Sequence, residues 1–135
     1  MEEQIKALDP NLIIYDRKDY DNEIHVYCER MHEDKRVHQT TIKTLNDIPF
    51  NGKKVFIHLK VKRFKNTFDS SIDKKTITEQ FDFLNDTGRR TKRLDELLYD
   101  LTKNQSFNAS SEYANKFITS ISGNTLIRMV LKKTK

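Results

Sequence analysis

Three apolar patterns at helical spacing lie in the last third of the chain, and they limit the possible folds more than any other feature. Each pattern repeats at intervals of three or four residues, which places its apolar side chains on one face of a helix. The three sets are Leu94, Leu97, Leu98 and Leu101; Tyr113, Ala114, Phe117 and Ile118; and Leu126, Ile127, Val130 and Leu131. The sequence therefore predicts a three-helix module over residues 86–135.

The last of these helices has the features of a recognition helix. Ser122 stands where an N-cap is needed, because its hydroxyl can accept from the free N–H groups of the first turn. The residues outside the apolar set, Asn124, Thr125, Arg128 and Lys132, are left for a second face. This division is typical of the helix-turn-helix motif, in which one side of the helix packs and the other contacts DNA. An ordinary amphipathic helix with a solvated basic face has the same pattern.

Residues 1–85 indicate a small antiparallel β module. Apolar or alternating runs at 12–15, 23–28, 37–45 and 55–64 are typical of strands. Asn51-Gly52 is the strongest hairpin signal, since a type I′ turn needs positive φ at both central positions. We therefore predict an α+β protein, with the β module at 1–85 and the helix-turn-helix module at 86–135.

The positive charge lies mainly in the helical module. The formal net charge is +5, and residues 86–135 hold ten Lys and Arg against five Asp and Glu. Such surfaces bind nucleic acid or acidic partners. We expect Asn124, Thr125, Arg128 and Lys132 to face the major groove of duplex DNA. The phosphates are expected to contact a run of cations at the start of the module, which consists of Arg89, Arg90, Lys92 and Arg93.

A second basic run, residues 53–65, alternates with aromatic residues. Lys60, Lys62 and Arg63 lie near Phe56 and Phe64, a composition that can serve a nucleic-acid surface. The solvated face of a two-faced strand has the same composition. We expect these cations to add a second contact surface.

The remaining residues exclude several classes of function. The chain lacks a glycine-rich phosphate loop, a nucleophile elbow and any pair of carboxylates in a catalytic context, so we expect no enzymatic activity. Cys28, His32 and His38 cluster in and beside a charged loop, and Cys28 and His32 could supply half of a zinc site, but residues 66–73 offer no thiol or imidazole for the other half. We therefore expect no bound metal or cofactor. The single cysteine and the absence of a membrane-spanning stretch predict a cytoplasmic protein.

An ordered series of short segments resembles the N-terminal region of bacterial insertion-sequence transposases of the ISL-three type. The matching segments, which run in the same order, are Val37-His38-Gln39-Thr40-Thr41-Ile42-Lys43-Thr44-Leu45-Asn46-Asp47-Ile48-Pro49, Gly52-Lys53-Lys54-Val55, Leu59-Lys60-Val61-Lys62-Arg63-Phe64, Thr78-Glu79-Gln80-Phe81, Arg89-Arg90-Thr91-Lys92-Arg93-Leu94 and Ser122-Gly123-Asn124-Thr125-Leu126-Ile127-Arg128. In that family a zinc ribbon precedes a helix-turn-helix, and both bind the ends of the element. A catalytic domain with acidic metal ligands follows them.

Two departures from the family bear on function. The family's ribbon has a Cys-x-x-Cys knuckle before the Val-His and cysteines soon after the Arg-Phe. Here only Cys28 lies near the first position, and residues such as Asn66, Ser70 and Ser71 stand at the second. The resemblance thus implies a degenerate ribbon without metal. It ends at the helix-turn-helix, so transposition by this chain alone is not expected.

Two functions follow as hypotheses. The first is a regulatory protein, derived from a transposase N-terminal region, that binds duplex DNA through the last helix. A module of this size is expected to bind weakly unless it dimerises or uses both halves. The alternative is an interaction protein of a phage or mobile element that inhibits a host nucleoprotein machine, such as a CRISPR defence nuclease. Its partner would be a protein or nucleoprotein rather than free DNA.

Overall fold

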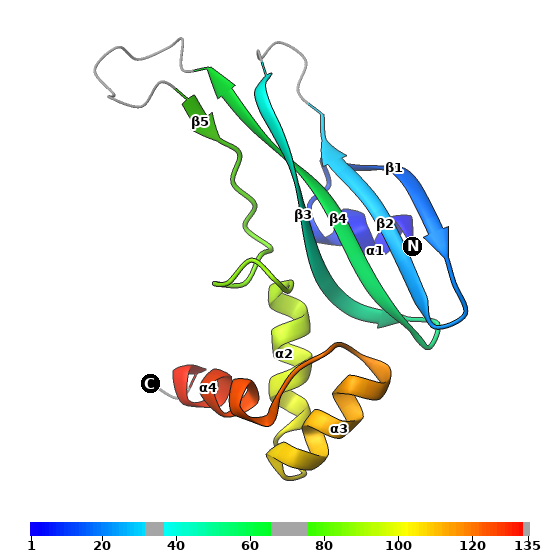
Figure 1. Ribbon diagram of the computed structural model, residues 1–135, viewed down its shortest axis with the longest axis vertical. Helices are drawn as coiled ribbons and strands as arrows, with labels where there is room; N and C mark the ends of the chain where they lie inside the picture. Colours follow the sequence, from blue (N-terminus) through cyan, green and yellow to red (C-terminus); the bar gives the residue numbers. More distant parts are fainter. Residues whose placement is uncertain (32–36, 66–75, 134–135) are drawn as a thin grey trace.

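The computed structural model describes residues 1–31, 37–65 and 76–133, and this part of the chain has an α+β fold, as the sequence predicted (Figure 1). The elements are, in chain order, α1 (Glu2–Leu8), β1 (Leu12–Asp19), β2 (Glu23–Arg30), β3 (Val37–Phe50), β4 (Lys53–Lys65), β5 (Thr76–Thr78), α2 (Lys92–Leu101), α3 (Phe107–Phe117) and α4 (Gly123–Lys133). The sheet forms one end of the molecule, and α2, α3 and α4 form the other (Figure 1).

The sheet is mixed rather than wholly antiparallel, which corrects the prediction for residues 1–85. Its strand order is β1-β2-β4-β3, and β5 pairs with the end of β4. β2 and β4 run parallel, from the pair Glu23 and Lys54 to the pair Cys28 and Leu59. All other strand pairs are antiparallel. The alternation of apolar residues predicts which face of a strand is buried, but it carries no information on the direction of the neighbouring strand.

Two hairpins make up most of the sheet. The turn at 20–22 joins β1 to β2, and Asn51 and Gly52 join β3 to β4. The φ angles of Asn51 and Gly52 are 51° and 74°, the positive values that the predicted tight turn requires. The Asn-Gly hairpin is therefore confirmed.

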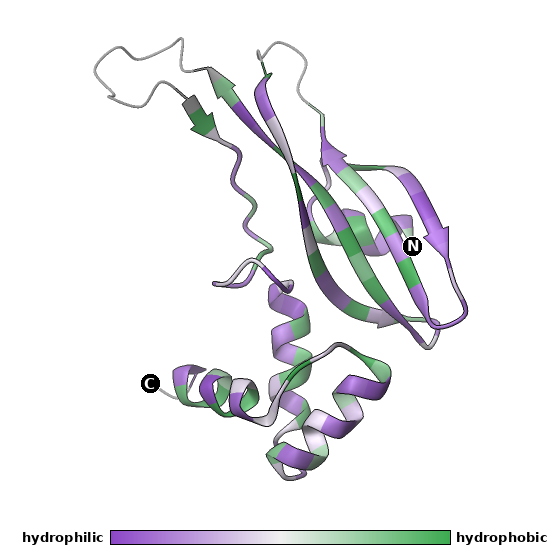
Figure 2. Cartoon of the chain, in the orientation of Figure 1, coloured by the Kyte–Doolittle hydropathy of each residue, from purple (hydrophilic) through white to green (hydrophobic). Residues whose placement is uncertain are grey.

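One face of the sheet forms the first hydrophobic core. Alternate side chains of β2 and β4 point to this face, as the alternation of colours along both strands in Figure 2 indicates. α1 packs on the same face through Ile5, together with Phe81 and Phe83 from the segment that follows β5. The buried sheet residues of this core are Leu12, Ile24, Val26, Cys28, Leu45, Val55, Ile57 and Leu59.

The second hydrophobic core lies between α2, α3 and α4. Its buried members are Leu94, Leu98, Ala114, Ile118, Ile121 and Leu126. Each helix begins at a capping side chain. The hydroxyls of Thr91, Ser106 and Ser122 accept from the backbone N–H groups of Leu94, Ala109 and Thr125, at 3.3, 3.1 and 3.1 Å. The predicted cap at Ser122 is confirmed.

The predicted apolar faces of α3 and α4 are partly wrong. Tyr113 and Phe117 on α3 are 49% and 50% exposed, and Ile127 and Leu131 on α4 are 37% and 59% exposed. α4 packs through Leu126, which was predicted, and through Met129, which was not. The helices are short, and the core between them is small. Each helix can therefore bury only a narrow stripe, although a wider set of residues has helical spacing.

β3 connects the sheet to the helical unit. The backbone of Asn46 pairs with both neighbours of Arg90: its N–H donates to Arg89 at 2.9 Å, and its carbonyl accepts from Thr91 at 3.0 Å. Asp47, of which 2% is exposed, accepts from the Thr91 hydroxyl and from the Arg93 guanidinium. None of the helices in the described residues is long and apolar enough to span a bilayer.

Candidate nucleic-acid interface

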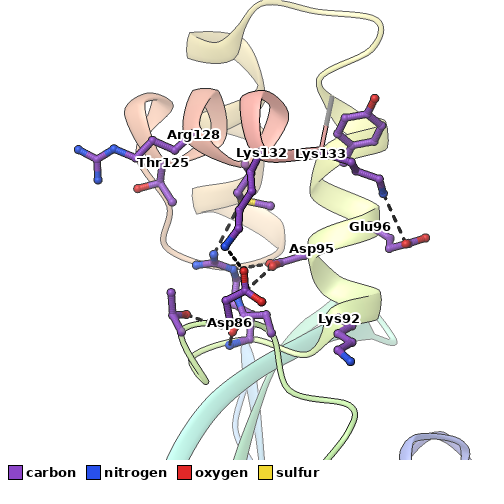
Figure 3. A pocket seen from close by; sticks show the side chains of 13 residues that line it. Asp86, Lys92, Asp95, Glu96, Thr125, Arg128, Lys132 and Lys133 are labelled. Atoms are coloured by element: carbon purple, nitrogen blue, oxygen red, sulfur yellow. Dashed lines mark hydrogen bonds and ion pairs between the residues drawn. The ribbon is translucent and has the colours of Figure 1, made fainter. Parts of the chain in front are cut away.

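A groove of about 520 Å³ lies between α4, α2 and the loop at 85–87 (Figure 3). From α4, Thr125, Arg128 and Lys132 line it, three residues whose spacing puts them on one stripe of the helix. Asn124 lies on the adjacent exposed surface. The structure thus brings together three of the four side chains predicted to face DNA.

The loop that forms one wall of the groove is fixed by Asn85. Its side-chain oxygen accepts from the backbone N–H groups of Arg89 and Arg90, at 3.2 and 3.3 Å, and from the Thr87 hydroxyl at 3.1 Å. Its amide group donates to Asp95 on α2 at 3.0 Å. The loop is therefore a closed turn attached to α2, and it holds its exposed side chains next to α4.

Acidic residues partner several of the groove's cations. Lys132 pairs with Asp86, and the hydrogen bond from Lys132 lowers the pKa of that carboxyl below 3.8. Lys133 Nζ lies 3.4 Å from a carboxylate oxygen of Glu96. These two pairs are exposed, whereas the third, Arg90 with Asp95, is partly buried at 2.6 Å. Arg90 therefore holds the loop to α2 rather than projecting into solvent.

The side chains of Arg128 and Arg89 make no ion pair with the described residues. Both are exposed, and Figure 3 shows the Arg128 guanidinium pointing away from Asp86. Lys92 is also exposed, on the first turn of α2. Among the described residues, Arg128, Arg89 and Lys92 are thus exposed cations that a phosphate could reach without first breaking an ion pair.

Arg93 lies outside this surface, at the junction between β3 and α2. Its Nε donates to Asp47 at 2.9 Å, so the side chain that the sequence assigned to a phosphate contact joins the two halves of the molecule. Sequence reasoning did not select Lys133, although it lies one residue beyond Lys132 and lines the same groove. Its Nζ lies 4.4 Å from the centre of the Tyr99 ring, a cation–π contact.

The three cations of the predicted second contact surface on β4 differ in their surroundings. Arg63 is exposed, whereas Lys60 and Lys62 each have Nζ 3.6 Å from a carboxylate oxygen of Glu29. Lys62 also donates to the carbonyl of Arg30 at 2.7 Å, and 11% of its side chain is exposed. Lys62 therefore ties β4 to the end of β2.

Cys28, one of the two residues that could supply half of a zinc site, is not accessible to solvent. It lies in the sheet core with 0% exposure, and burial raises the pKa of its thiol to about 12. His32 lies outside the described residues. Residues 1–31, 37–65 and 76–133 contain no group of three or more His, Cys, Asp or Glu side chains that could hold a metal ion.

Comparison of the chain with protein-family models, with curated proteins and with solved structures finds no match.

Proposed function

We propose that this protein is a regulatory DNA-binding protein that binds duplex DNA through α4. In this proposal α3, the connection at 118–122 and α4 act as a helix-turn-helix, and the chain derives from a transposase N-terminal region whose zinc ribbon has become a metal-free sheet. The observation that carries the proposal is the exposed stripe on α4. There the side chain of Arg128 is exposed and makes no ion pair with the described residues, and Asn124 and Thr125 lie on the same helix near it.

The chemistry of this stripe suits DNA. An unpaired guanidinium can make a bidentate contact with guanine, and an exposed asparagine can make one with adenine. Arg89 and Lys92, on the adjoining loop and first turn of α2, are exposed cations, and in this proposal they contact the sugar–phosphate backbone. Lys132 is 71% exposed, so it can exchange Asp86 for a phosphate at small cost.

The test is fluorescence anisotropy of the full chain with a mixed-sequence duplex over a salt series. Affinity should fall steeply as salt rises, because the bound cations displace counterions. Arg128→Ala should weaken binding, and Arg89→Ala should weaken it with a salt slope smaller by about one. Lys116→Ala is the matched control, since Lys116 is an exposed cation on α3 that does not line the groove. Absence of binding at low salt, or equal losses in all three variants, would contradict the proposal.

A second candidate is supported by the exposed apolar side chains. Ile127 and Leu131 on α4 and Tyr113 and Phe117 on α3 are all at least one-third exposed, which is unusual for a surface that contacts only phosphates. These side chains favour the interaction protein, which would inhibit a nucleoprotein machine of the host by contacting its protein part. Under this alternative, Ile127→Ser with Leu131→Ser would abolish inhibition, whereas Arg128→Ala would not.

A further inference from the structure

A chain of hydrogen bonds crosses the sheet face opposite to α1. Thr44 Oγ1 lies 3.0 Å from His58 Nδ1, His58 Nε2 lies 2.8 Å from His25 Nδ1, and His25 Nε2 lies 2.9 Å from a carboxylate oxygen of Glu23. These four side chains come from β3, β4 and β2. They alternate with buried residues along their strands, so they share the face that does not carry the hydrophobic core.

The direction of this chain follows from its acidic end. An ionised carboxylate can only accept, so His25 carries its proton on Nε2 and, when neutral, accepts at Nδ1. His58 must then donate from Nε2 and accept at Nδ1, and the Thr44 hydroxyl supplies that last hydrogen. With both rings neutral, every donor therefore has one acceptor, and both rings are the Nε2–H tautomer.

The two rings are held in this arrangement by their neighbours. His25 stacks on Phe56 with ring centres 4.7 Å apart and planes 6° apart, and His58 stacks on Tyr27 at 4.4 Å and 13°. Tyr20 meets His25 edge-on at 5.5 Å. These stacking contacts fix the planes of both rings.

The charges around the pair come from two strands. Glu23 on β2 is the anion that contacts the pair. Lys18 on β1 is the cross-strand partner of His25, and its Nζ lies 5.4 Å from the centre of the Tyr27 ring. Tyr20 and Tyr27 are the other titratable groups in contact with the rings. The pKa of His58 is lowered below 6.5, chiefly by burial and further by the charges of His25 and Lys18.

The pair lies at the seam between the two hairpins of the sheet. In the strand order of the described residues, only the parallel pairing of β2 with β4 joins the β1–β2 hairpin to the β3–β4 hairpin. His25 belongs to the first hairpin and His58 to the second. Their hydrogen bond therefore spans the seam directly.

We propose that His25 and His58 form a one-proton site, and that a second proton opens the seam between the two hairpins. One added proton is accommodated, because a charged His25 can donate to His58 Nε2 and to Glu23, while His58 becomes the Nδ1–H tautomer and donates to the Thr44 hydroxyl. A second proton leaves two N–H groups facing each other across 2.8 Å, each on a positively charged ring. That contact lacks an acceptor and is repulsive, so it is lost.

The consequence is a loss of stability in mild acid. The pKa of His58 is lower in the folded protein than the ordinary 6.5 of the unfolded chain. The contribution of this site to the free energy of unfolding is therefore fully present above pH 6.5. It falls as the pH drops from 6.5 towards the pKa of His58 in the folded protein. Within that interval each pH unit lowers the folding equilibrium constant by about tenfold.

The first test is NMR of the imidazole nitrogens in the wild-type chain, with the exposed His38 as an internal reference. We expect both rings of the pair to be Nε2–H tautomers at pH 7.5 and to titrate in two separate steps. The second step should coincide with faster hydrogen exchange of the β2 and β4 amides. Titration of both rings in one step together with His38, or unchanged exchange, would overturn the proposal.

The second test is the urea midpoint of the variant His58→Gln between pH 7.5 and 5. Glutamine can still donate to His25 but takes up no proton, so this variant should lose the wild-type fall in the midpoint below pH 6.5. The matched control His38→Gln should keep that fall. A wild-type pH profile in His58→Gln would overturn the proposal. If His58→Gln does not fold, the titration of the wild-type chain decides the question.

Discussion

Arg93 donates to Asp47 across the junction between the helical unit and the sheet, with Arg93 Nε 2.9 Å from Asp47 Oδ1. The same carboxylate oxygen accepts from the hydroxyl of Thr91, the N-cap of α2, at 2.7 Å. One carboxylate on β3 therefore fixes both the start of α2 and its first-turn arginine. The orientation of α2 relative to the sheet depends on this group.

Removal of Arg93 should destabilise the protein more than removal of a neighbouring cation. Only 2% of the Asp47 side chain is exposed, so Arg93→Ala leaves a buried carboxylate without its counterion. Because 27% of the Arg93 side chain is exposed, water can screen part of this charge, and we expect a loss of about 2–3 kcal/mol in the free energy of unfolding. Urea denaturation measures the loss. Arg89→Ala is the control and should change stability by less than about 0.5 kcal/mol.

The positions of Arg89, Arg90 and Arg93 illustrate what a sequence can and cannot predict. Helical spacing and capping residues predicted the helices and the cap at Ser122, and Asn51-Gly52 predicted a hairpin, because these signals depend on residues close in the chain. The three cations belong to one basic run, yet they differ in role: Arg89 is exposed, Arg90 pairs with Asp95, and Arg93 pairs with an acid distant in sequence. Arg93 meets Asp47, 46 residues away, and no local pattern identifies that partner.

In the sheet, too, local sequence patterns predict some features, whereas others depend on residues distant in the chain. Alternation predicted the buried face of β4, but the parallel pairing of β2 with β4 and the contact of His25 with His58 depend on strand order. These two histidines are 33 residues apart in the chain, and no local pattern pairs them. The exposed faces of α3 and α4 were mispredicted for a related reason, because the size of the core decides which apolar residues it buries.

Neutralising Asp86 should strengthen DNA binding if α4 is the DNA-binding helix. Asp86 pairs with Lys132 and lines the same groove as Arg128, where its negative charge opposes a phosphate. Asp86→Asn frees Lys132, and we expect the affinity for a duplex at low salt to rise roughly two- to fivefold, with a steeper salt dependence. Fluorescence anisotropy measures both quantities.

The control for this variant is Asp82→Asn, which makes the same change in net charge. Asp82 is exposed in the same connecting segment but does not line the groove. An equal gain in affinity from both substitutions would mean that only net charge matters. That result would contradict a specific role of Asp86 beside α4.

The ion pair between Arg30 and Asp9 should stabilise the protein at neutral pH and lose this effect in acid. It donates to Asp9 at the end of α1 from Nε and Nη2, at 3.1 and 2.5 Å, and its guanidinium lies 4.4 Å from the centre of the Phe81 ring. Burial by itself would raise the pKa of Asp9, but the hydrogen bonds from Arg30 and from the backbone of Asn11 hold it below 3.8. Asp9 therefore contributes stability above pH 3.8, and this contribution is lost as the pH falls through the folded value.

The variant Asp9→Asn tests this contribution. At pH 7 it should unfold at lower urea concentration than the wild type, since the asparagine cannot pair with the Arg30 charge. The difference should shrink as the pH falls below 3.8, because the wild-type carboxyl is then protonated as well. Asp21→Asn, at an exposed position in the turn between β1 and β2, is the control. A difference that stays constant from pH 7 to pH 2.5 would contradict the assignment.

Cys28 should be unreactive in the folded protein and reactive on unfolding. Its side chain is fully buried, and burial, followed by the charge of Asp47, raises the pKa of the thiol to about 12. The thiolate is the reactive form, so the burial of the side chain and its lack of ionisation both oppose modification near neutral pH. A chromogenic disulfide reagent should therefore label the native chain slowly and the urea-unfolded chain within seconds to minutes. If modification requires global unfolding, the logarithm of the labelling rate should rise in Arg93→Ala in proportion to its loss of stability. Rapid labelling of the wild type in native buffer would place Cys28 outside the sheet core.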